Sequence, residues 1–317
     1  MKKVRIGIDV MGGDYAPSAT VEGSVLAMAD MSDTAEIVLI GDQDSINNEL
    51  KKHGVSNSSF EIVHAPQVID MGEHPTKALV NKPQSSIALG FKHLKKGQLD
   101  GFASAGNTGA MFVGGYMTVK PVPGILRPCI SSVLPKLDGG VNVILDVGSN
   151  ADCKPDVLYQ FGILGSLFAE HVCGVHNPKV GLLNIGEEES KGNMLTIATH
   201  EMMKGTSEFN FCGNIESRHL FDDACDVIVC DGFSGNIILK QAESVYNLVK
   251  KRNIKDDYFD RFNYENYGGT PILGLNKTVV IGHGISNPTA IKNMISLTAD
   301  VIEADLTTKI LTNFNND

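Results

Sequence analysis

The chain has 317 residues, which is long enough to bury a substantial core in one or two domains. Its formal charge of −10 argues against general nucleic-acid binding, so an acidic partner would need a local basic patch. The 6 cysteines include no Cys-x-x-Cys pair, which argues against a zinc site. A strand pattern begins at Val4, so we expect no signal peptide, and free thiols then indicate the cytoplasm.

Short apolar runs that end in glycine, aspartate or asparagine turns alternate with amphipathic segments along the chain. The predicted strands are Val4–Ile8, Ile37–Ile40, Phe60–Val63, Val141–Leu145, Val180–Leu183, Val227–Val229 and Val279–Ile281. The helical period predicts helices at Ala19–Met31, Ser45–His53, Ser85–Lys95, Val157–Val172 and Thr289–Leu311. This alternation predicts an α/β fold with a mostly parallel sheet and helices on both faces. In such folds ligands collect at the carboxyl ends of strands.

The stretch between Asp100 and Lys120 has no charged residue and contains five glycines. Its centre, Ser104–Gly109, lies between an apolar run and a predicted helix. Unpaired N–H groups at a helix start, with glycines that let a ligand approach the backbone, make a good anion cradle. The five glycines, with Asn107 and Thr108, argue against a membrane span.

Taken singly, the glycine loops leave other chemistries open. Asp9 with Gly12 and Gly13 is similar to the phosphate-binding turn of sugar kinases. The Ser104–Gly109 loop matches neither a Walker loop nor the dinucleotide fingerprint. Ser234 is placed like a nucleophile, but Asn236 stands where a nucleophile elbow needs glycine, which disfavours a covalent acyl-enzyme.

The opening run Ile8–Pro17 (IDVMGGDYAP) is followed by further blocks rich in glycine and asparagine. In chain order these are Ser104–Ala110 (SAGNTGA), Leu145–Asn150 (LDVGSN), Gly181–Glu189 (GLLNIGEEE) with Lys191 and Gly192, Gly213–Glu216 (GNIE), Cys230–Asn236 (CDGFSGN), Tyr267–Gly274 (YGGTPILG) and Ile281–Asn287 (IGHGISN). Together they resemble the bacterial phosphate acyltransferases, the acyl-acyl carrier protein:phosphate transacylases. The blocks occur in that family's order and cover nearly the whole chain.

This resemblance implies that a long-chain acyl group passes from acyl carrier protein to inorganic phosphate. The acyl phosphate would then feed a membrane glycerol-3-phosphate acyltransferase in phospholipid synthesis. The implied fold is a three-layer α/β/α sandwich like that of phosphotransacetylases and of the isopropylmalate dehydrogenase type. We expect a single domain over residues 1–317, a homodimer, and a cytoplasmic location with a peripheral membrane position left open.

In the implied reaction phosphate is the nucleophile, and it needs a binding site more than a base. Backbone N–H groups at Gly106–Gly109 and the point charge of Lys191 would hold it. Preorganised amides would stabilise the oxyanion by roughly 3–4 kcal/mol per donor. The amides expected after predicted strands are those of Asn107, Asn150, Asn184 and Asn236. The scheme requires no metal and no organic cofactor.

We therefore expect four residues to act in catalysis, namely Lys191, Asn236, Asn184 and His283. The residues expected to contact substrate are Asp9, Gly12, Gly13, Asp14, Ser104, Gly106, Asn107, Thr108, Gly109, Asn150, Asp231 and Gly232. Carboxylates would repel phosphate, so Asp9, Asp14, Asp146 and Asp231 either contact pantetheine or have structural duty, such as helix capping. His283 is either a general acid–base or a turn residue, and Lys191 lies either on a solvated charged loop or over the active cleft.

Relatives commonly carry a long helical hairpin between the blocks that end at Asn236 and begin at Tyr267. Here that distance is short, and we expect only a short projecting arm at about 241–266. The run Asn81–Gln84 is also less basic than in many members. Two other classes of function remain as alternatives. One is an oxidoreductase on the related dehydrogenase-type fold, although this sequence lacks the dinucleotide-binding fingerprint. The other is a non-catalytic acyl-binding protein.

Overall fold

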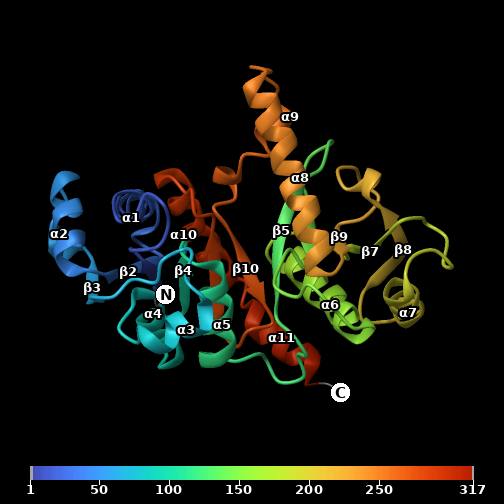
Figure 1. Ribbon diagram of the computed structural model, residues 1–317, viewed down its shortest axis with the longest axis horizontal. Coiled ribbons are helices and arrows are strands. Elements are labelled where there is room, and N and C mark those ends of the chain that lie inside the picture. Colours follow the sequence, from blue (N-terminus) through green and yellow to red (C-terminus); the bar gives the residue numbers. More distant parts are fainter. Residues whose placement is uncertain (1–2, 316–317) are drawn as a thin grey trace. The chain divides into compact units, whose positions relative to one another are not determined.

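The computed structural model describes residues 3–315 (Figure 1). These residues fold into two compact units. Within the described residues, unit 1 comprises residues 3–121 and 264–307, and unit 2 comprises residues 122–263 and 308–315. The single domain expected over residues 1–317 stays a prediction.

Unit 1 contains a sheet in the order β3-β2-β1-β4-β11-β10. The pairs from β3 to β11 are parallel, and β10 is antiparallel to β11. The strands are β1 (Val4–Asp9), β2 (Ala35–Gly41), β3 (Glu61–His64), β4 (Gly101–Ser104), β10 (Gly269–Leu273) and β11 (Thr278–Gly282).

Helices cover both faces of this sheet (Figure 1). One layer is formed by α1 (Ser18–Met31), α2 (Gln43–Lys52) and α10 (Pro288–Glu303). The other is formed by α3 (Pro75–Asn81), α4 (Ser86–Lys95) and α5 (Thr108–Thr118). The fully buried Ile6 and Ile8 of β1 pack in a core with Val21 of α1 and Ile291 of α10. Because strands of a parallel sheet are buried on both faces, they read as continuous apolar runs.

Unit 2 contains a sheet in the order β5-β6-β9-β7-β8, in which only β5 pairs antiparallel. Its strands are β5 (Cys129–Pro135), β6 (Val141–Leu145), β7 (Lys179–Asn184), β8 (Asn210–Glu216) and β9 (Val227–Val229). Its helices are α6 (Pro155–His171), α7 (Met194–Met203), α8 (Gly232–Lys251) and α9 (Asp257–Asp260). Helix α11 (Leu306–Phe314) begins at the boundary between the units.

The predicted arm, at about 241–266, contains the second half of α8, the short α9 and a 3-10 turn at Tyr264–Asn266. After α9 the chain returns to the turn that follows β5. Tyr258 Oη donates to the carbonyl of Pro135 at 3.2 Å, and Arg261 Nη1 donates to that of Lys136 at 2.6 Å. The ring of Phe262 packs on Phe221 with 5.4 Å between centroids. Of the helices in residues 3–315, none has the length and apolar content that crossing a bilayer requires.

The α/β class, the mostly parallel sheet and the helices on both faces are confirmed. Two predicted strands, Val141–Leu145 and Val227–Val229, have the predicted bounds. The single helix predicted at Thr289–Leu311 is wrong, because the chain breaks between α10 and α11 at Asp305, whose φ is +50°. The strands predicted from the sequence also omit β5, β8 and β10. Strands β5, β8 and β10 carry polar, proline or glycine residues that interrupt the apolar pattern.

Helices α1 and α10 approach each other closely at Gly23. A Cβ placed on Gly23 would lie 2.5 Å from Cβ of Ile291 and 2.7 Å from the carbonyl oxygen of Pro288. The Pro288 oxygen belongs to the backbone and cannot rotate away. Any larger residue therefore has to push the two helices apart.

We predict that Gly23→Val lowers the free energy of unfolding by about 1–3 kcal/mol, because it overpacks a filled core. Urea unfolding of the full chain measures the change. Gly72→Ala is the matched control, since a Cβ at Gly72 meets nothing within 4 Å. Equal stability of Gly23→Val and the parent would show that the α1–α10 contact tolerates a side chain.

Candidate active site

The residues expected from the sequence fall into two groups, one in each unit. In unit 1 they lie after β1, around the start of α5 and after β11. In unit 2 they lie after β6 and β7 and at the start of α8. Each group lies at the carboxyl ends of parallel strands, where the alternation predicts a ligand site.

Asp9 ends β1 and holds two glycine loops together. Its carboxylate is 1% exposed and accepts hydrogen bonds from Ser104 Oγ at 2.6 Å and from the N–H of Met11 at 3.0 Å. Ser104 Oγ in turn accepts from the N–H of Gly106 at 2.9 Å. A Cβ on Gly12 would lie 2.4 Å from Asp9 Oδ2, so only glycine fits there. Burial raises the pKa of Asp9, against the opposing effect of the hydroxyls of Ser104 and Ser86.

Asn107 is buried at the start of α5, where both polar atoms of its side-chain amide are hydrogen-bonded. Its Oδ1 accepts from the N–H of Ala110 at 2.9 Å, which caps the helix. Its Nδ2 donates to the carbonyls of Asp70, Met71 and Glu73 at 3.0–3.1 Å. Both amide hydrogens are therefore engaged with the backbone, which leaves none for a substrate oxyanion. The neighbouring Thr108, the first residue of α5, is exposed.

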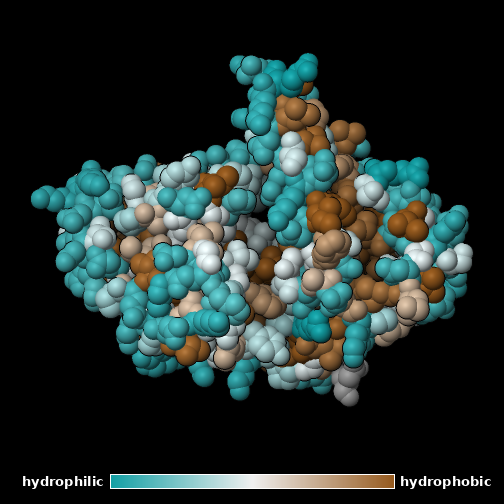
Figure 2. Space-filling model, in the orientation of Figure 1, coloured by the Kyte–Doolittle hydropathy of each residue, from teal (hydrophilic) through white to brown (hydrophobic). Residues whose placement is uncertain are grey.

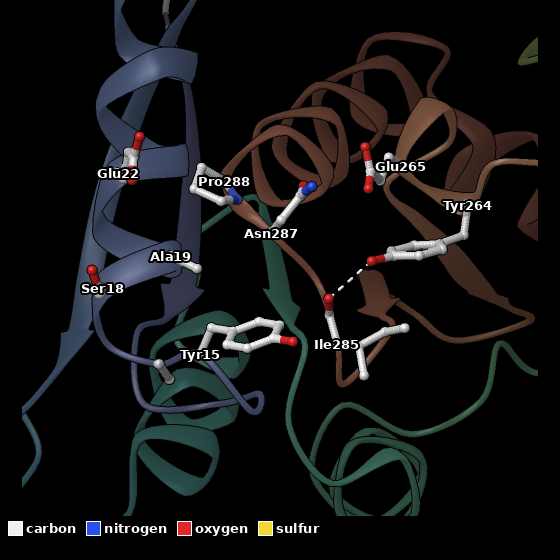
Figure 3. A pocket seen from close by; sticks show the side chains of 10 residues that line it. Tyr15, Ser18, Ala19, Glu22, Tyr264, Glu265, Ile285, Asn287 and Pro288 are labelled. Carbon is white, nitrogen blue, oxygen red and sulfur yellow. Dashed lines mark hydrogen bonds between the residues drawn. The ribbon is translucent and has the colours of Figure 1, made fainter. Parts of the chain in front are cut away.

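The loops after β1 and β11 meet near a pocket of unit 1. Gly13 has a φ of +105°, and the N–H of Asp14 donates to the carbonyl of Gly284 at 2.7 Å. The pocket, of about 690 Å³, is lined by the starts of α1 and α10 and by the segment around Tyr264 (Figure 3). Tyr264 Oη donates to the carbonyl of Ile285 at 2.9 Å, and its ring lies 5.2 Å from that of His283. None of the expected site residues lines this pocket.

Asp146 takes the corresponding place after β6 in unit 2. Its fully buried carboxylate accepts from the N–H of Ile130 at 3.1 Å, from Ser149 Oγ at 2.8 Å and from the N–H of Asn150 at 2.6 Å. Asn150 Nδ2 donates to Asp146 Oδ2 at 3.0 Å, to the carbonyl of Pro128 at 2.9 Å and to Ser149 Oγ at 3.1 Å. Both amide hydrogens of Asn150 thus serve the loop.

The start of α8 packs on this loop. Asp231 caps the helix by accepting from the N–H of Ser234 at 2.7 Å. A Cβ on Gly232 would lie 2.8 Å from Asp146 Oδ2, so the helix approaches the carboxylate only through glycine. Asn236 lies within α8 and not directly after a strand, and its Nδ2 donates to the carbonyl of Val147 at 2.9 Å. Within the described chain its second amide hydrogen has no partner.

Asn184 ends β7, and its amide reaches the loop that carries Lys191. Asn184 Nδ2 donates to the carbonyl of Lys191 at 3.0 Å, and its Oδ1 accepts from the N–H of Ile185 at 2.9 Å. The Lys191 side chain is exposed. Among residues 3–315, no group forms a hydrogen bond or ion pair with its ammonium.

Two cysteines near Asp146 are poor nucleophiles. Burial and the Asp146 carboxylate raise the pKa of Cys153 to about 12, and they raise the pKa of the buried Cys230 as well. The thiolate is the reactive form of cysteine, so both side chains stay unreactive thiols near neutral pH.

Comparison with solved structures gives the class of fold. A phosphotransacetylase from Streptococcus pyogenes superposes with a TM-score of 0.68 at 18% identity, covering 95% of this chain and 94% of that one. A branched-chain phosphotransacylase from Enterococcus faecalis gives a TM-score of 0.64 at 12% identity, with 94% and 99% covered. This protein therefore has the phosphotransacylase fold.

Sequence comparison gives the family. Residues 4–309 match the family described as "Fatty acid synthesis protein". A phosphate acyltransferase from Desulforamulus reducens is 41% identical, with 99% of this chain and 98% of that one covered. One from Dictyoglomus turgidum is 39% identical, with 98% of both covered. The chain belongs to the phosphate acyltransferase family.

Sequence reasoning assigned no role to Ser86, Asn214 or His200, which hold the two groups of loops in place. Asn214 lies in a block that matches the family, but that match alone carries no information on its partners. The pocket also includes Tyr15 and Tyr264, to which the sequence pattern gives no separate role: Tyr15 stands within the Ile8–Pro17 block, and Tyr264 lies among the aromatic residues of the predicted arm.

The buried Asp9 should make stability depend on pH. The pKa of Asp9 is raised in the folded state, so the protonated carboxyl group stabilises the fold. This stabilisation is fully present at pH values below the unfolded-state pKa and is lost as pH rises through the folded-state pKa. We predict that Asp9→Asn removes this dependence. The free energy of unfolding of the variant, relative to the parent, should therefore increase between about pH 4 and pH 7.

Urea unfolding at a series of pH values measures this difference. Asp138→Asn is the control, because Asp138 is exposed in a turn. A difference between Asp9→Asn and the parent that stays constant with pH would contradict the raised pKa of Asp9.

Proposed function

We propose that this protein transfers a long-chain acyl group from acyl-acyl carrier protein to inorganic phosphate, giving acyl phosphate and free carrier. The observation that carries the proposal is the 39–41% identity, over nearly the full length, to proteins named phosphate acyltransferase. The asparagine and glycine loops of both units are intact, which favours an active enzyme over a non-catalytic acyl-binding protein.

The proposed chemistry is direct attack of phosphate on the thioester carbonyl. The C–O bond of the acyl phosphate forms, the C–S bond breaks, and the carrier leaves as a thiolate. The raised thiol pKa values of Cys153 and Cys230 support this path over an acyl-cysteine intermediate. The scheme uses no metal and no organic cofactor.

Two features of the chain would attract phosphate, one in each unit. In unit 1 the turn Ser104–Gly109 leads into α5, whose first N–H groups and dipole favour an anion at the exposed Thr108. In unit 2 the ammonium of Lys191, which has no partner among residues 3–315, is a point charge suited to phosphate. We propose that Gly12, Gly13, Asp14 and Gly232 shape the substrate-binding loops, and that Asp9, Asp231 and Asn150 act there through the hydrogen bonds described above.

The hydrogen bonds divide the four asparagines by their capacity as oxyanion donors. Asn107 and Asn150 each donate both amide hydrogens to other groups of the protein. Asn184 and Asn236 each show a single donated bond, to Lys191 and to Val147. We therefore propose Asn184 and Asn236 as oxyanion donors, and Asn107 and Asn150 as supports of the substrate loops. His283, whose Nδ1 accepts from the N–H of Ile285 at 3.4 Å, is proposed as an acid–base through Nε2.

We further propose that the protein works as a homodimer in the cytoplasm, with acyl carrier protein as partner, and that it supplies a membrane glycerol-3-phosphate acyltransferase. Hydrophobic side chains gather on the surface over α8 (Figure 2). Among them Phe233, Ile237 and Leu248 are 64%, 52% and 60% exposed. An exposed apolar surface on one long helix supports self-association. A peripheral membrane contact is the other use of this surface.

The function is tested by incubating the protein with acyl-acyl carrier protein and phosphate and measuring acyl phosphate. We predict that Lys191→Met raises the KM for phosphate by about 10- to 100-fold, because a charge-assisted hydrogen bond is lost. The KM for acyl carrier should not change. Lys240→Met, at an exposed lysine of α8, is the control. If the parent makes no acyl phosphate, the proposed function fails, and an unchanged phosphate dependence of Lys191→Met removes Lys191 from the site.

The end of α8 carries Lys250, Lys251 and Arg252, followed by Lys255, and these residues are exposed. This basic patch is either a solvated basic face or the docking site of the acidic carrier. We predict that replacing Lys250, Lys251 and Arg252 with Ser raises the KM for acyl carrier and flattens its dependence on salt. The KM for a small acyl thioester should stay the same. An equal response of both substrates would exclude the patch as the docking site.

A further inference from the structure

The loop between β7 and α7 carries three consecutive glutamates, Glu187–Glu189, and then Ser190 and Lys191. A lysine so close to three carboxylates would ordinarily pair with one of them. A Cβ on Gly186 would lie 2.9 Å from Glu188 Oε2 and 2.9 Å from Cγ of Lys191, so the loop is tightly turned. The Lys191 ammonium nevertheless has no partner within the described part of the chain.

Groups on neighbouring elements hold two of the glutamates instead. Lys204 Nζ on α7 donates to Glu189 Oε2 at 2.7 Å, and this contact lowers the pKa of Glu189. His219 Nε2, in the short 3-10 helix after β8, lies 3.6 Å from Glu187 Oε1. Lys204 therefore pairs with Glu189 from outside the loop, and His219 faces Glu187. Among the described residues, neither of these two carboxylates pairs with Lys191.

The backbone of the loop is held by two asparagines. Asn184 Nδ2 donates to the carbonyl of Lys191, and Asn214 Nδ2 on β8 donates to the carbonyl of Glu188, both at 3.0 Å. The N–H of Lys191 donates to that same Glu188 carbonyl at 3.0 Å. The Asn214 amide thus donates to the Glu188 carbonyl, which also accepts the hydrogen bond from the backbone N–H of Lys191.

A buried histidine sets the orientation of Asn214. His200 on α7 is 4% exposed, and its Nδ1 lies 3.0 Å from Asn214 Oδ1. When Nδ1 carries the proton it donates to Oδ1, which turns the amide N–H₂ toward Glu188. The ring of His200 packs against Phe211 with 5.2 Å between centroids, which limits its rotation.

We propose that Asn214, oriented by His200, is a positioning residue that keeps Lys191 unpaired and available to phosphate. This inference rests on the proposed function only through the identity of the anion. An aspartate at position 214 has the shape of asparagine but cannot donate, and its charge would repel the Glu188 carbonyl. The loop would then be released, and Lys191 could pair with its own glutamates.

The test is Asn214→Asp in the full-length protein. We expect the KM for phosphate to rise about tenfold with kcat at saturating phosphate unchanged, because the variant alters binding of one substrate. In the Lys191→Met background the same change should have no further effect, since both residues act through one ammonium. Asn210→Asp is the control: it places the same charge on the same strand, where Asn210 Nδ2 lies 3.4 Å from the carbonyl of Asn177.

Hydrogen exchange and calorimetry separate failure of this inference from failure of the proposed function. Asn214→Asp should speed exchange of the Lys191 amide and weaken phosphate binding measured by titration calorimetry. If the parent binds phosphate but forms no acyl phosphate, the proposed reaction is wrong while these measurements still test Asn214. Unchanged exchange, unchanged phosphate binding, or an equal loss with and without Lys191 would overturn the role of Asn214.

Discussion

Two buried carboxylates, one in each unit, organise the loops that carry the candidate site. Asp9 ends β1 and Asp146 ends β6, and neither exposes more than 1% of its surface. A buried carboxylate is expensive unless donors surround it. Backbone N–H groups and serine hydroxyls provide those donors in both units, from Met11 and Ser104 in unit 1 and from Ile130 and Ser149 in unit 2. These hydrogen bonds tie the loops that contain Met11 and Ser149 to the ends of β1 and β6.

This arrangement explains why glycine is required beside the carboxylates. A Cβ on Gly12 would lie 2.4 Å from Asp9 Oδ2, and one on Gly232 would lie 2.8 Å from Asp146 Oδ2. Backbone N–H groups reach the carboxylate only when no side chain intervenes. Glycines that look in sequence like phosphate contacts thus have a structural role as well, because they let the protein satisfy its own buried charge.

The same reasoning separates supporting side chains from those left for chemistry. Asn107 and Asn150 are saturated with bonds to the protein, so they rigidify the loops. Asn184 and Asn236 retain donor capacity, and Lys191 retains its whole ammonium. In a chain with a formal charge of −10, Lys191 has no partner among residues 3–315 although it follows three glutamates, and Lys204 of α7 and His219 of the turn after β8 face two of these glutamates. The surrounding hydrogen bonds thus decide which of these side chains are available to a substrate.

The amino-acid sequence alone predicts the α/β class, the bounds of strands such as Val141–Leu145, and the family, because apolar period and glycine loops are local properties of the chain. It placed Asn107, Asn150, Asn184 and Asn236 as equivalent donors, since residue type and distance from a strand cannot distinguish them. Which of these amides are engaged is visible only in the folded chain, because the partners of Asn107 (Asp70, Met71 and Glu73) and of Asn236 (Val147) lie far away in sequence. The break at Asp305 and the hold of Asn214 on the Lys191 loop likewise depend on backbone geometry and long-range contacts that no periodic pattern encodes.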